Sequence, residues 1–196
     1  MRAFELIAVG ASWGGLRALQ EILAGLPADF PPAIVVAQHR SADAQRGALV
    51  SALGSRSPLP VCEAGDKDPI RGGRVHVSPP DYHLLVEGDG FALSVDEPVR
   101  FSRPSIDVLL ESAADAYGAR MIGLILTGAS ADGAAGLALV RDRGGMTIVQ
   151  DPGTAERTEM PEAAIAAGAA QHVVPLAGIA PLLVESCGRQ AAGRTA

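Results

Sequence analysis

The sequence predicts an α/β fold: a doubly wound, mostly parallel sheet with helices on both faces and an antiparallel hairpin at one edge. Three observations predict it. Short, continuous apolar runs at residues 6–9 and 33–37 are typical of strands buried on both faces. Leucines at helical spacing separate these two runs. The same alternation returns after residue 121, and alternating strands and helices favour a parallel sheet.

The chain is long enough for one large core. Its 196 residues lie within the usual size of a single domain, and hydrophobic residues make up 48% of them. Charged residues make up only 19%, so the composition excludes a chain that is disordered throughout. We therefore expect one domain over residues 1–187. Residues 188–196 are polar and small, and we expect them to form a disordered tail.

The N-terminal part predicts a strand-helix-strand unit. Residues 6–9 form an apolar run that ends at Gly10, and residues 33–37 form an Ile/Val-rich run that ends before Gln38. The helix between them ends at Pro27. Its apolar stripe consists of Leu16, Leu19, Leu23 and Leu26. A right-handed crossover of this kind places the two strands side by side and parallel.

The C-terminal part repeats this pattern. Apolar runs predict strands over residues 121–126, 146–150 and 172–175. Helices are predicted between them, over residues 132–142 and 161–167. Because strands and helices alternate again, we expect these strands to extend the same parallel sheet.

The middle of the chain has a different pattern. Residues 74–78, 83–87 and 91–95 are short segments of alternating polarity, and a Gly-Asp-Gly turn at 88–90 joins the last two. We therefore expect an antiparallel hairpin at an edge of the sheet. The apolar stripe of residues 104–117 then predicts a long amphipathic helix.

Charge and composition exclude several functional classes. The net charge is −6 and no run of Lys or Arg is present, so a general nucleic-acid binder is excluded. No apolar stretch approaches the roughly 18 residues of a membrane span, so we expect no direct membrane insertion. Only two cysteines, Cys62 and Cys187, are present, which favours reduced thiols in a cytoplasmic protein.

No metal site is predicted. His76, Asp81 and His83 lie close in the sequence but lack a convincing ligand spacing. We interpret them as solvated polar residues of the hairpin region. We expect neither a metal nor a cofactor.

The first strand is followed by a candidate nucleophile. Residues 10–14 satisfy G-x-S-x-G, the pattern that lifts a serine hydroxyl on a tight turn between a strand and a helix, and Ser12 is that serine. The start of the next helix would direct backbone N–H groups at an oxyanion. A Gly-rich turn of this kind is also typical of plain connections and phosphate loops, so the motif alone does not decide.

The phosphate-loop alternatives fit poorly. A dinucleotide fingerprint needs glycine where Ser12 stands and an acidic residue near the end of the second strand, where the chain has Gln38 and His39. A Walker A loop needs Gly-Lys before Ser or Thr, whereas Gly133 is followed by alanines. A nucleotide-binding oxidoreductase is therefore disfavoured.

Two further reactive side chains follow strands of the same predicted sheet. His39 follows the second strand and is a candidate general base; a histidine that only lines a cleft is the alternative. Asp132 follows the strand at 121–126, where its ordinary role would be to cap a helix. Ligands bind beyond the carboxyl ends of parallel strands. Three complementary groups there favour a triad of Ser12, His39 and Asp132.

Several blocks of the sequence, over residues 5 to about 185, closely resemble the catalytic domain of bacterial chemotaxis protein-glutamate methylesterases. Each block is unspecific by itself, and together they are highly specific. They are Val9-Gly10-Ala11-Ser12 with Gly14-Gly15, Gln38-His39, Arg103-Pro104-Ser105 with Asp107, Leu126-Thr127-Gly128 with Asp132-Gly133-Ala134-Ala135-Gly136, and Met160-Pro161 with Ala164-Ile165.

The resemblance implies an activity and a substrate. The family's serine, histidine and aspartate fall on Ser12, His39 and Asp132. The implied reaction is hydrolysis of glutamate methyl esters on cytoplasmic helices of chemoreceptors to glutamate and methanol, with glutamine deamidation as a related activity. Backbone N–H groups around Trp13 and Gly14 are the candidate oxyanion donors.

The chain departs from the family pattern just after His39, at Arg40 and Ser41, and at two positions near the nucleophile. Better-known members have a hydroxyl residue after the nucleophile and a methionine after the later Thr-Gly, whereas this chain has Trp13 and Ala129. Both positions adjoin the predicted oxyanion site. An alternative function therefore stays open: a binding module for receptors or signalling complexes that keeps the fold and has little turnover.

The resemblance also implies how the enzyme is controlled. In two-domain relatives a receiver domain covers the catalytic cleft, but the first predicted strand here begins near residue 5. We therefore expect a stand-alone catalytic domain with an open cleft and no control by phosphorylation in cis. We expect the rim around Trp13, Arg40 and Arg103 to meet a carboxylate-rich receptor helix, with Arg103 as the candidate substrate contact.

Overall fold

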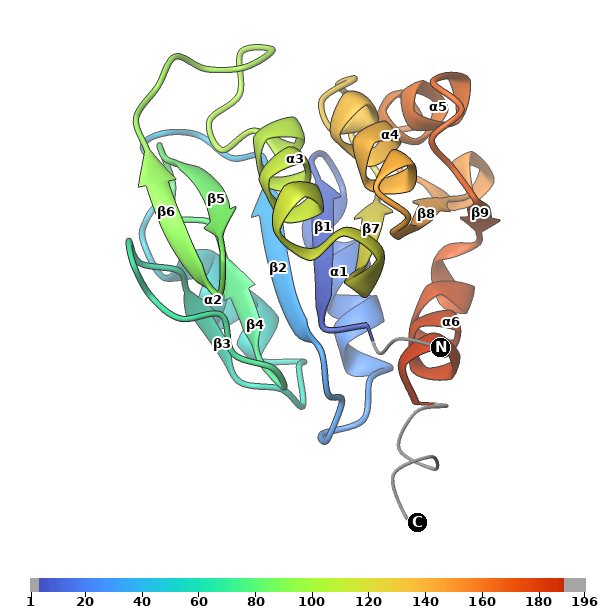
Figure 1. Cartoon of the computed structure of the whole chain (residues 1–196), viewed down its shortest axis with the longest axis horizontal. Helices are drawn as coiled ribbons and strands as arrows, with labels where there is room; N and C mark the ends of the chain where they lie inside the picture. The colour runs from blue at the N-terminus through green and yellow to red at the C-terminus, as the bar shows by residue number, and fades with distance from the viewer. Residues whose placement is uncertain (1–3, 189–196) are drawn as a thin grey trace.

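The computed structural model describes residues 4–188 and has a seven-stranded parallel sheet at its centre (Figure 1). The strand order is β3-β4-β2-β1-β7-β8-β9, and every neighbouring pair is parallel. The strands are β1 (Leu6–Ala11), β2 (Ala33–Gln38), β3 (Val61–Glu63), β4 (Val75–Val77), β7 (Met121–Ile125), β8 (Met146–Gln150) and β9 (His172–Val174).

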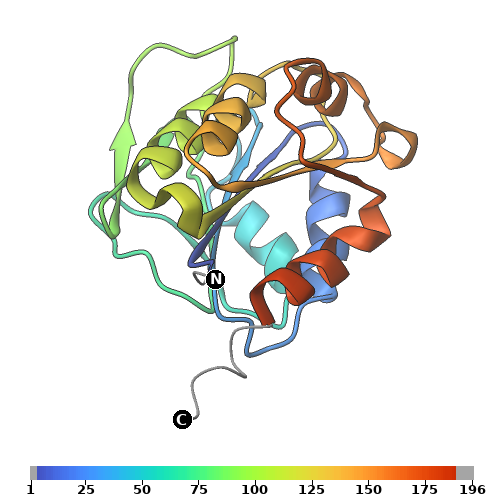
Figure 2. The same cartoon turned by 45° about the vertical axis from the view of Figure 1, so that its right-hand side comes forward.

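Helices cover both faces of this sheet (Figure 2). One face carries α1 (Gly15–Ala24), α2 (Ala48–Gly54) and α6 (Leu176–Gly188); the other carries α3 (Ile106–Tyr117), α4 (Ala134–Asp142) and α5 (Glu159–Ala166). Two short 3-10 turns, η1 (Gly118–Arg120) and η2 (Pro152–Thr154), complete the helical elements described.

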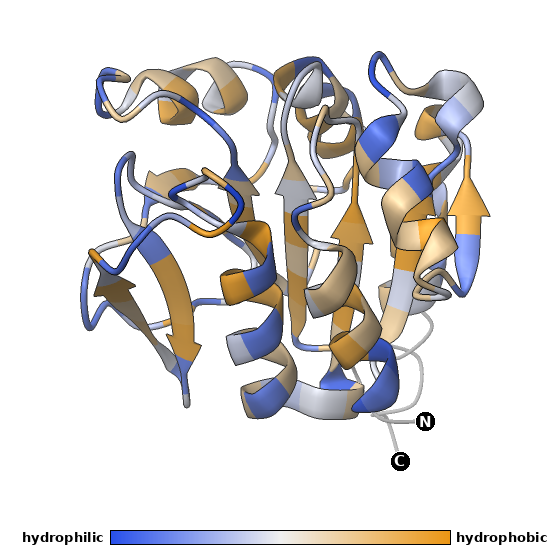
Figure 3. Ribbon diagram, turned by 90° about the horizontal axis from the view of Figure 1, so that it is seen from above, coloured by the Kyte–Doolittle hydropathy of each residue, from blue (hydrophilic) through white to orange (hydrophobic). Residues whose placement is uncertain are grey.

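The two faces have separate hydrophobic cores, and the strand β1 contributes to both. Ile7 and Val9 pack with α1 and α6, whereas Leu6 and Ala8 pack with α3. This alternation follows from the two-residue period of a strand, and it is why β1 is apolar along its whole length. Figure 3 shows the central strands coloured largely as hydrophobic. The doubly wound fold predicted from the sequence is confirmed.

The middle of the chain differs from the expectation in detail. Residues 74–78, grouped above with the hairpin segments, supply β4, which is parallel to β2. The hairpin of β5 (His83–Glu87) and β6 (Gly90–Ser94) is confirmed as antiparallel, but it forms a two-stranded sheet of its own. It packs on α3: its buried side chains join the core of that face, and the Val86 amide donates to the Ser112 hydroxyl at 3.1 Å.

Several element boundaries also differ from those predicted. The sequence patterns do not predict α2, β3 or α6, and Pro181 lies inside α6. The helix expected from residue 132 begins at Ala134, because Gly133 has a φ of 96° and belongs to the preceding turn. Residue 188, expected in the tail, ends α6, and 189–196 lie outside the described residues. Within residues 4–188, no helix is long and apolar enough to span a membrane.

The topology creates a switch point beside β1. From β1 the chain passes through α1 to β2 on one side, and later returns to β7 on the other side. Connections therefore leave the carboxyl ends of β1 and β7 in opposite directions, which opens the usual place for a binding site in a doubly wound sheet.

Candidate active site

Ser12 lies immediately after β1, on the turn that leads into α1. Its amide donates to the Thr127 carbonyl at 3.0 Å, and its carbonyl accepts from the Gly15 amide at 2.9 Å. Gly14 has a φ of 79°, and a Cβ there would lie 2.8 Å from the Cβ of Glu156. Only glycine therefore fits at this position, and the tight turn leaves Ser12 half-buried at the carboxyl edge of the sheet.

His39 lies on the neighbouring strand at nearly the same level. Its amide donates to the Ala11 carbonyl at 2.9 Å, so the two strands end in register with Ser12 and His39 as their next residues. The Gln38 amide group, from the last residue of β2, donates to the Ser12 carbonyl at 2.8 Å. The imidazole of His39 is only 11% exposed, and its Nε2 lies 2.7 Å from Oδ2 of Asp132.

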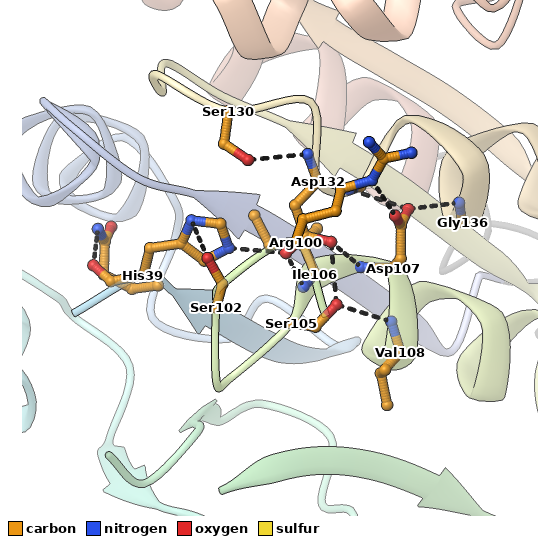
Figure 4. A network of polar contacts seen from close by, with 12 residues as sticks. His39, Arg100, Ser102, Ser105, Ile106, Asp107, Val108, Ser130, Asp132 and Gly136 are labelled. Atoms are coloured by element: carbon orange, nitrogen blue, oxygen red, sulfur yellow. Dashed lines mark hydrogen bonds and ion pairs between the residues drawn. The ribbon is translucent and has the colours of Figure 1, made fainter. Parts of the chain in front are cut away.

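Asp132 is fully buried between β7 and the start of α4. Besides His39, three donors bind its carboxylate: the Ser105 hydroxyl at 2.9 Å, the Ile106 amide at 2.7 Å and the Asp107 amide at 3.1 Å. The last two are the first amides of α3, so the N-terminus of that helix points at the carboxylate. Figure 4 shows these groups converging on Asp132.

These contacts keep Asp132 ionised. Burial alone would raise the pKa of its carboxyl, because a buried charge loses its hydration. The hydrogen bonds from His39, Ile106 and Asp107 outweigh burial, and the pKa of Asp132 lies below its ordinary value of 3.8. The positive end of the α3 dipole acts in the same direction. An ionised carboxylate at this place orients an imidazole and stabilises its protonated form.

The two nitrogens of His39 have different surroundings. Because Nε2 is bound to Asp132, Nδ1 is the nitrogen that faces the site, where the Ser102 hydroxyl lies 3.4 Å away. The Ser12 hydroxyl forms no hydrogen bond with His39 in the part of the chain that the structure describes. Catalytic hydrogen bonds often tighten only once substrate is bound.

Free backbone donors surround Ser12. Among residues 4–188, the amides of Trp13, Gly14 and Ala129 donate to no other group. The loop at 127–129 lies directly against the nucleophile turn, since a Cβ on Gly128 would be 2.8 Å from the Cβ of Ser12. Unpaired amides beside a serine hydroxyl are the kind of donor that an oxyanion requires.

Trp13 packs against a neighbouring loop although its side chain is 60% exposed. Its ring N–H donates to Glu156 at 2.8 Å, and the Arg157 guanidinium lies 5.5 Å from the ring centre. Beside it lies a cavity of about 250 Å³, lined by Gly14, Arg17, Thr127, Gln150, Thr154 and Glu156 among others. The cavity thus shares Glu156 with the contact that holds the Trp13 ring.

Arg103, the candidate substrate contact, is bound within the protein. Its guanidinium binds Oδ1 of Asp81 at 2.6 and 3.0 Å, and donates to the carbonyls of Val95 and Asp96 at 2.8 and 3.0 Å. These contacts join two loops, one of which carries Ser102. They favour a bracing role for Arg103 over contact with a substrate.

The interpretation of two histidines as solvated polar residues is wrong. His76 and His83 are both buried. His83 accepts the Ser105 amide at Nδ1 and lies 3.2 Å from the Glu97 carbonyl at Nε2, so it holds the residue that binds Asp132. Among the described residues, no group of three or more His, Cys, Asp or Glu side chains could hold a metal.

Sequence reasoning missed Ser102 and His83 as partners of the site. Neither carries a local signal, because each is recruited through the folding of a loop onto a distant element. Ser105 and Asp107 enter the sequence analysis only through the family resemblance. The Ser-x-x pattern before a helix does predict Ser105 as an N-cap, which it is, but not its contact with Asp132.

Comparison with known proteins identifies the family of this chain. The family model described as CheB methylesterase matches residues 7–183. A putative protein-glutamate methylesterase/protein-glutamine glutaminase of Leptospira interrogans is 44% identical over 182 residues, covering 92% of this chain and 94% of that protein. A protein-glutamate methylesterase/protein-glutamine glutaminase of Anaeromyxobacter dehalogenans is 45% identical over 173 residues, 88% of this chain but 50% of that protein.

A solved structure is similar throughout. The CheB methylesterase catalytic domain of Thermotoga maritima superposes with a TM-score of 0.88 at 34% identity, covering 94% of this chain and 99% of that one. The sequence match thus extends over the strands, the covering helices and all three turns of the candidate site. The chain belongs to the CheB methylesterase family.

Proposed function

We propose that this protein is a protein-glutamate methylesterase with Ser12 as nucleophile, His39 as general base and Asp132 as the orienting carboxylate. The observation that carries the proposal is the hydrogen bond between His39 Nε2 and the buried Asp132 carboxylate. His39 follows β2, the strand beside β1, and Ser12 follows β1. This hydrogen bond fixes the tautomer of the imidazole and leaves Nδ1 as the basic nitrogen.

The reaction proceeds through an acyl-enzyme. His39 Nδ1 takes the Ser12 proton while the serine oxygen attacks the carbonyl carbon of the methyl ester. The tetrahedral intermediate expels the methoxy group, which accepts the proton now held by His39 and leaves as methanol. A water molecule, deprotonated by the same nitrogen, then attacks the acyl-enzyme and releases glutamate with Ser12 restored.

The unpaired amides supply the oxyanion site. The N–H groups of Trp13, Gly14 and Ala129 would bind the negative oxygen of the tetrahedral intermediate. Since all three are backbone donors, the side-chain departures at positions 13 and 129 leave the donors themselves in place. The N-terminus of α1 adds its positive dipole end below the same turn.

The names of the relatives support a proposal for the substrate class. Those relatives carry the names of a methylesterase and a glutamine glutaminase, and one acyl-enzyme serves both, with ammonia replacing methanol as the leaving group. We propose methylated glutamates on cytoplasmic helices of chemoreceptors, or of receptor-like proteins, as the substrate. The protein would then act in the cytoplasm.

Methanol release tests this function directly. Incubating the protein with a methylated receptor fragment is expected to release methanol with multiple turnovers and to leave free glutamate. The same fragment with glutamine at the methylated positions serves as the control, and should release ammonia only. Tight binding of the fragment without any methanol would instead support the alternative of a binding module.

A substitution of Arg103 tests whether this residue holds the loops beside the site in place. Replacing Arg103 with glutamine removes the clamp between Asp81 and the loop of Ser102. Turnover of a receptor fragment and of a small neutral ester should then fall by the same factor, about tenfold to a hundredfold, because misplacement of about 1 Å has effects of this size.

The matched control is Arg56→Gln, an exposed arginine after α2, which should leave both rates unchanged. Steady-state kinetics on both substrates measure the effect. A rise in KM confined to the receptor fragment would contradict the bracing role, and would favour the substrate contact predicted from the sequence.

A further inference from the structure

A second buried carboxylate lies next to Asp132 and is used by none of the steps above. Asp107, in the first turn of α3, is 5% exposed. Its Oδ1 accepts the Gly133 amide at 2.9 Å and the Gly136 amide at 2.8 Å. Gly133 is the N-cap of α4 and Gly136 lies in its first turn, so Asp107 binds the N-terminus of the helix that follows Asp132.

The two carboxylates cap each other's helices. Asp132 precedes α4 and accepts the first amides of α3, whereas Asp107 belongs to α3 and accepts the first amides of α4. The Asp107 backbone amide is itself a donor to Asp132. We propose that Asp107 is a positioning residue, which through this exchange of caps holds the Asp132 carboxylate against His39 Nε2. The inference rests on the proposed function.

Close packing restricts the same region. A Cβ on Gly133 would lie 2.6 Å from side-chain atoms of Ile106 and Ile125, and one on Gly136 would lie 2.9 Å from the Asp107 carbonyl. The first turns of α3 and α4 therefore touch through backbone, at a distance that only glycine permits. This contact therefore explains why glycine occurs at both positions of the spacing Asp132-Gly133-x-x-Gly136.

Asp107 has a perturbed pKa and a second contact, with Arg100. Burial raises the pKa of its carboxyl, and the neighbouring charge of Asp132 adds to the rise, while the amides of Gly136 and Gly133 oppose it. Arg100 Nε lies 3.6 Å from its Oδ2, and Arg100 belongs to the turn that places Ser102 on His39. Asp107 thereby connects the loop of Asp132 with the loop on the other side of the imidazole (Figure 4).

The same two helices offer a matched control. Asp115 of α3 and Arg143 after α4 form an exposed ion pair at 2.8 Å, at the opposite ends of these helices from Asp132. Because the pair is exposed, its loss should change stability little, so Asp115→Ala controls for a carboxylate removed from α3 away from the site. A positioning residue differs because its loss disturbs the bond between His39 and Asp132.

The experiment compares Asp107→Ala, Asp107→Asn and Asp115→Ala with the unaltered protein. Asp107→Ala should lower kcat for methanol release about tenfold to a hundredfold with little change in KM, because the catalytic groups are displaced while substrate contacts remain. Asp107→Asn keeps an oxygen acceptor for both amides and should recover most of kcat. Asp115→Ala should match the unaltered protein.

A spectroscopic measurement accompanies the kinetics. The downfield proton signal of the His39 ring N–H that faces Asp132 should weaken or shift in Asp107→Ala and stay in place in Asp107→Asn and Asp115→Ala. Thermal unfolding shows whether each variant folds. Should Asp107→Ala fail to fold, Asp107→Ser retains an oxygen set further back and should give the same loss of kcat.

Several outcomes would overturn the inference. They are full kcat in the alanine or serine variant, equal losses in Asp107→Ala and Asp115→Ala, or an unchanged ring-proton signal in a slow variant. Ser12→Ala separates this failure from failure of the proposed function. If Ser12→Ala keeps its activity, the proposed function is wrong; if it is inactive while Asp107→Ala is fully active, only the positioning role is wrong.

Discussion

Replacing Ser12 with alanine is expected to lower methanol release from a methylated receptor fragment by about 10⁶-fold, as in other serine triads. The reason is chemical, because the variant has no oxygen with which to form the acyl-enzyme. The oxyanion donors and the substrate contacts remain, so a small rate above that of water alone should persist.

The same substitution should leave the fold intact. The turn is held by backbone groups of Ser12, through the Thr127 carbonyl and the Gly15 amide, and alanine preserves both bonds. Ser41→Ala is the matched control, since Ser41 is an exposed serine two residues after His39. Methanol assays and thermal unfolding give the two readouts. Hydrolysis at the normal rate in Ser12→Ala would mean that another group is the nucleophile.

Replacing Asp132 with asparagine should lower kcat by about 10⁴-fold, by analogy with the equivalent change in a serine protease. All four groups around the carboxylate present hydrogens to it, two to each oxygen. An asparagine must turn its NH₂ toward one of these pairs. Either His39 then turns to the wrong tautomer, or the Ser105 hydroxyl and the Asp107 amide lose their acceptor.

The variant also makes a prediction about acid stability. Because the folded pKa of Asp132 lies below 3.8, its ionised form stabilises the folded protein fully above that pH. The contribution is lost as pH falls through the lower, folded value, where both states become protonated. The unaltered protein should therefore have a larger free energy of unfolding than Asp132→Asn. This difference should be constant near neutral pH and should shrink below about pH 4.

Denaturant unfolding at a series of pH values measures this difference, and Asp115→Asn is the control for an exposed carboxylate on a neighbouring helix. If the difference in free energy of unfolding between the unaltered protein and Asp132→Asn grew as the pH fell, that would contradict an ionised Asp132. A kcat that matches the unaltered protein would remove Asp132 from the mechanism, whatever its effect on stability.

Much of this architecture could be predicted from short-range patterns. The runs that became β1, β2 and β7 are apolar along their length because both faces of each strand are buried. Their order and right-handed crossovers bring their carboxyl ends to one edge. That is why three turns, far apart in the sequence, could be assigned to one site, and the structure does bring them to that edge. The roles of Ser12, His39 and Asp132 stay predictions.

Features that depend on contacts between distant segments could not be predicted from the sequence. The hairpin leaves the main sheet because its apolar side chains are buried against α3, and periodicity cannot say which surface buries them. His83 is a polar residue in a hairpin strand, where exposure to solvent is expected, yet it is buried and accepts the Ser105 amide. Arg103 has the charge expected of a docking residue, and the sequence does not indicate its partly exposed ion pair with Asp81; its contact with a substrate stays a prediction.

The sequence by itself determined the strand-end turns, the glycines and the reactive groups upon them, because these follow from neighbours a few residues apart. Only the tertiary structure decided what surrounds those groups. The state of Asp132 depends on the N-terminus of α3, which begins 26 positions earlier in the chain, at Ile106. A carboxylate's charge is set by the donors that burial brings to it, and those donors are assembled only when the helices pack.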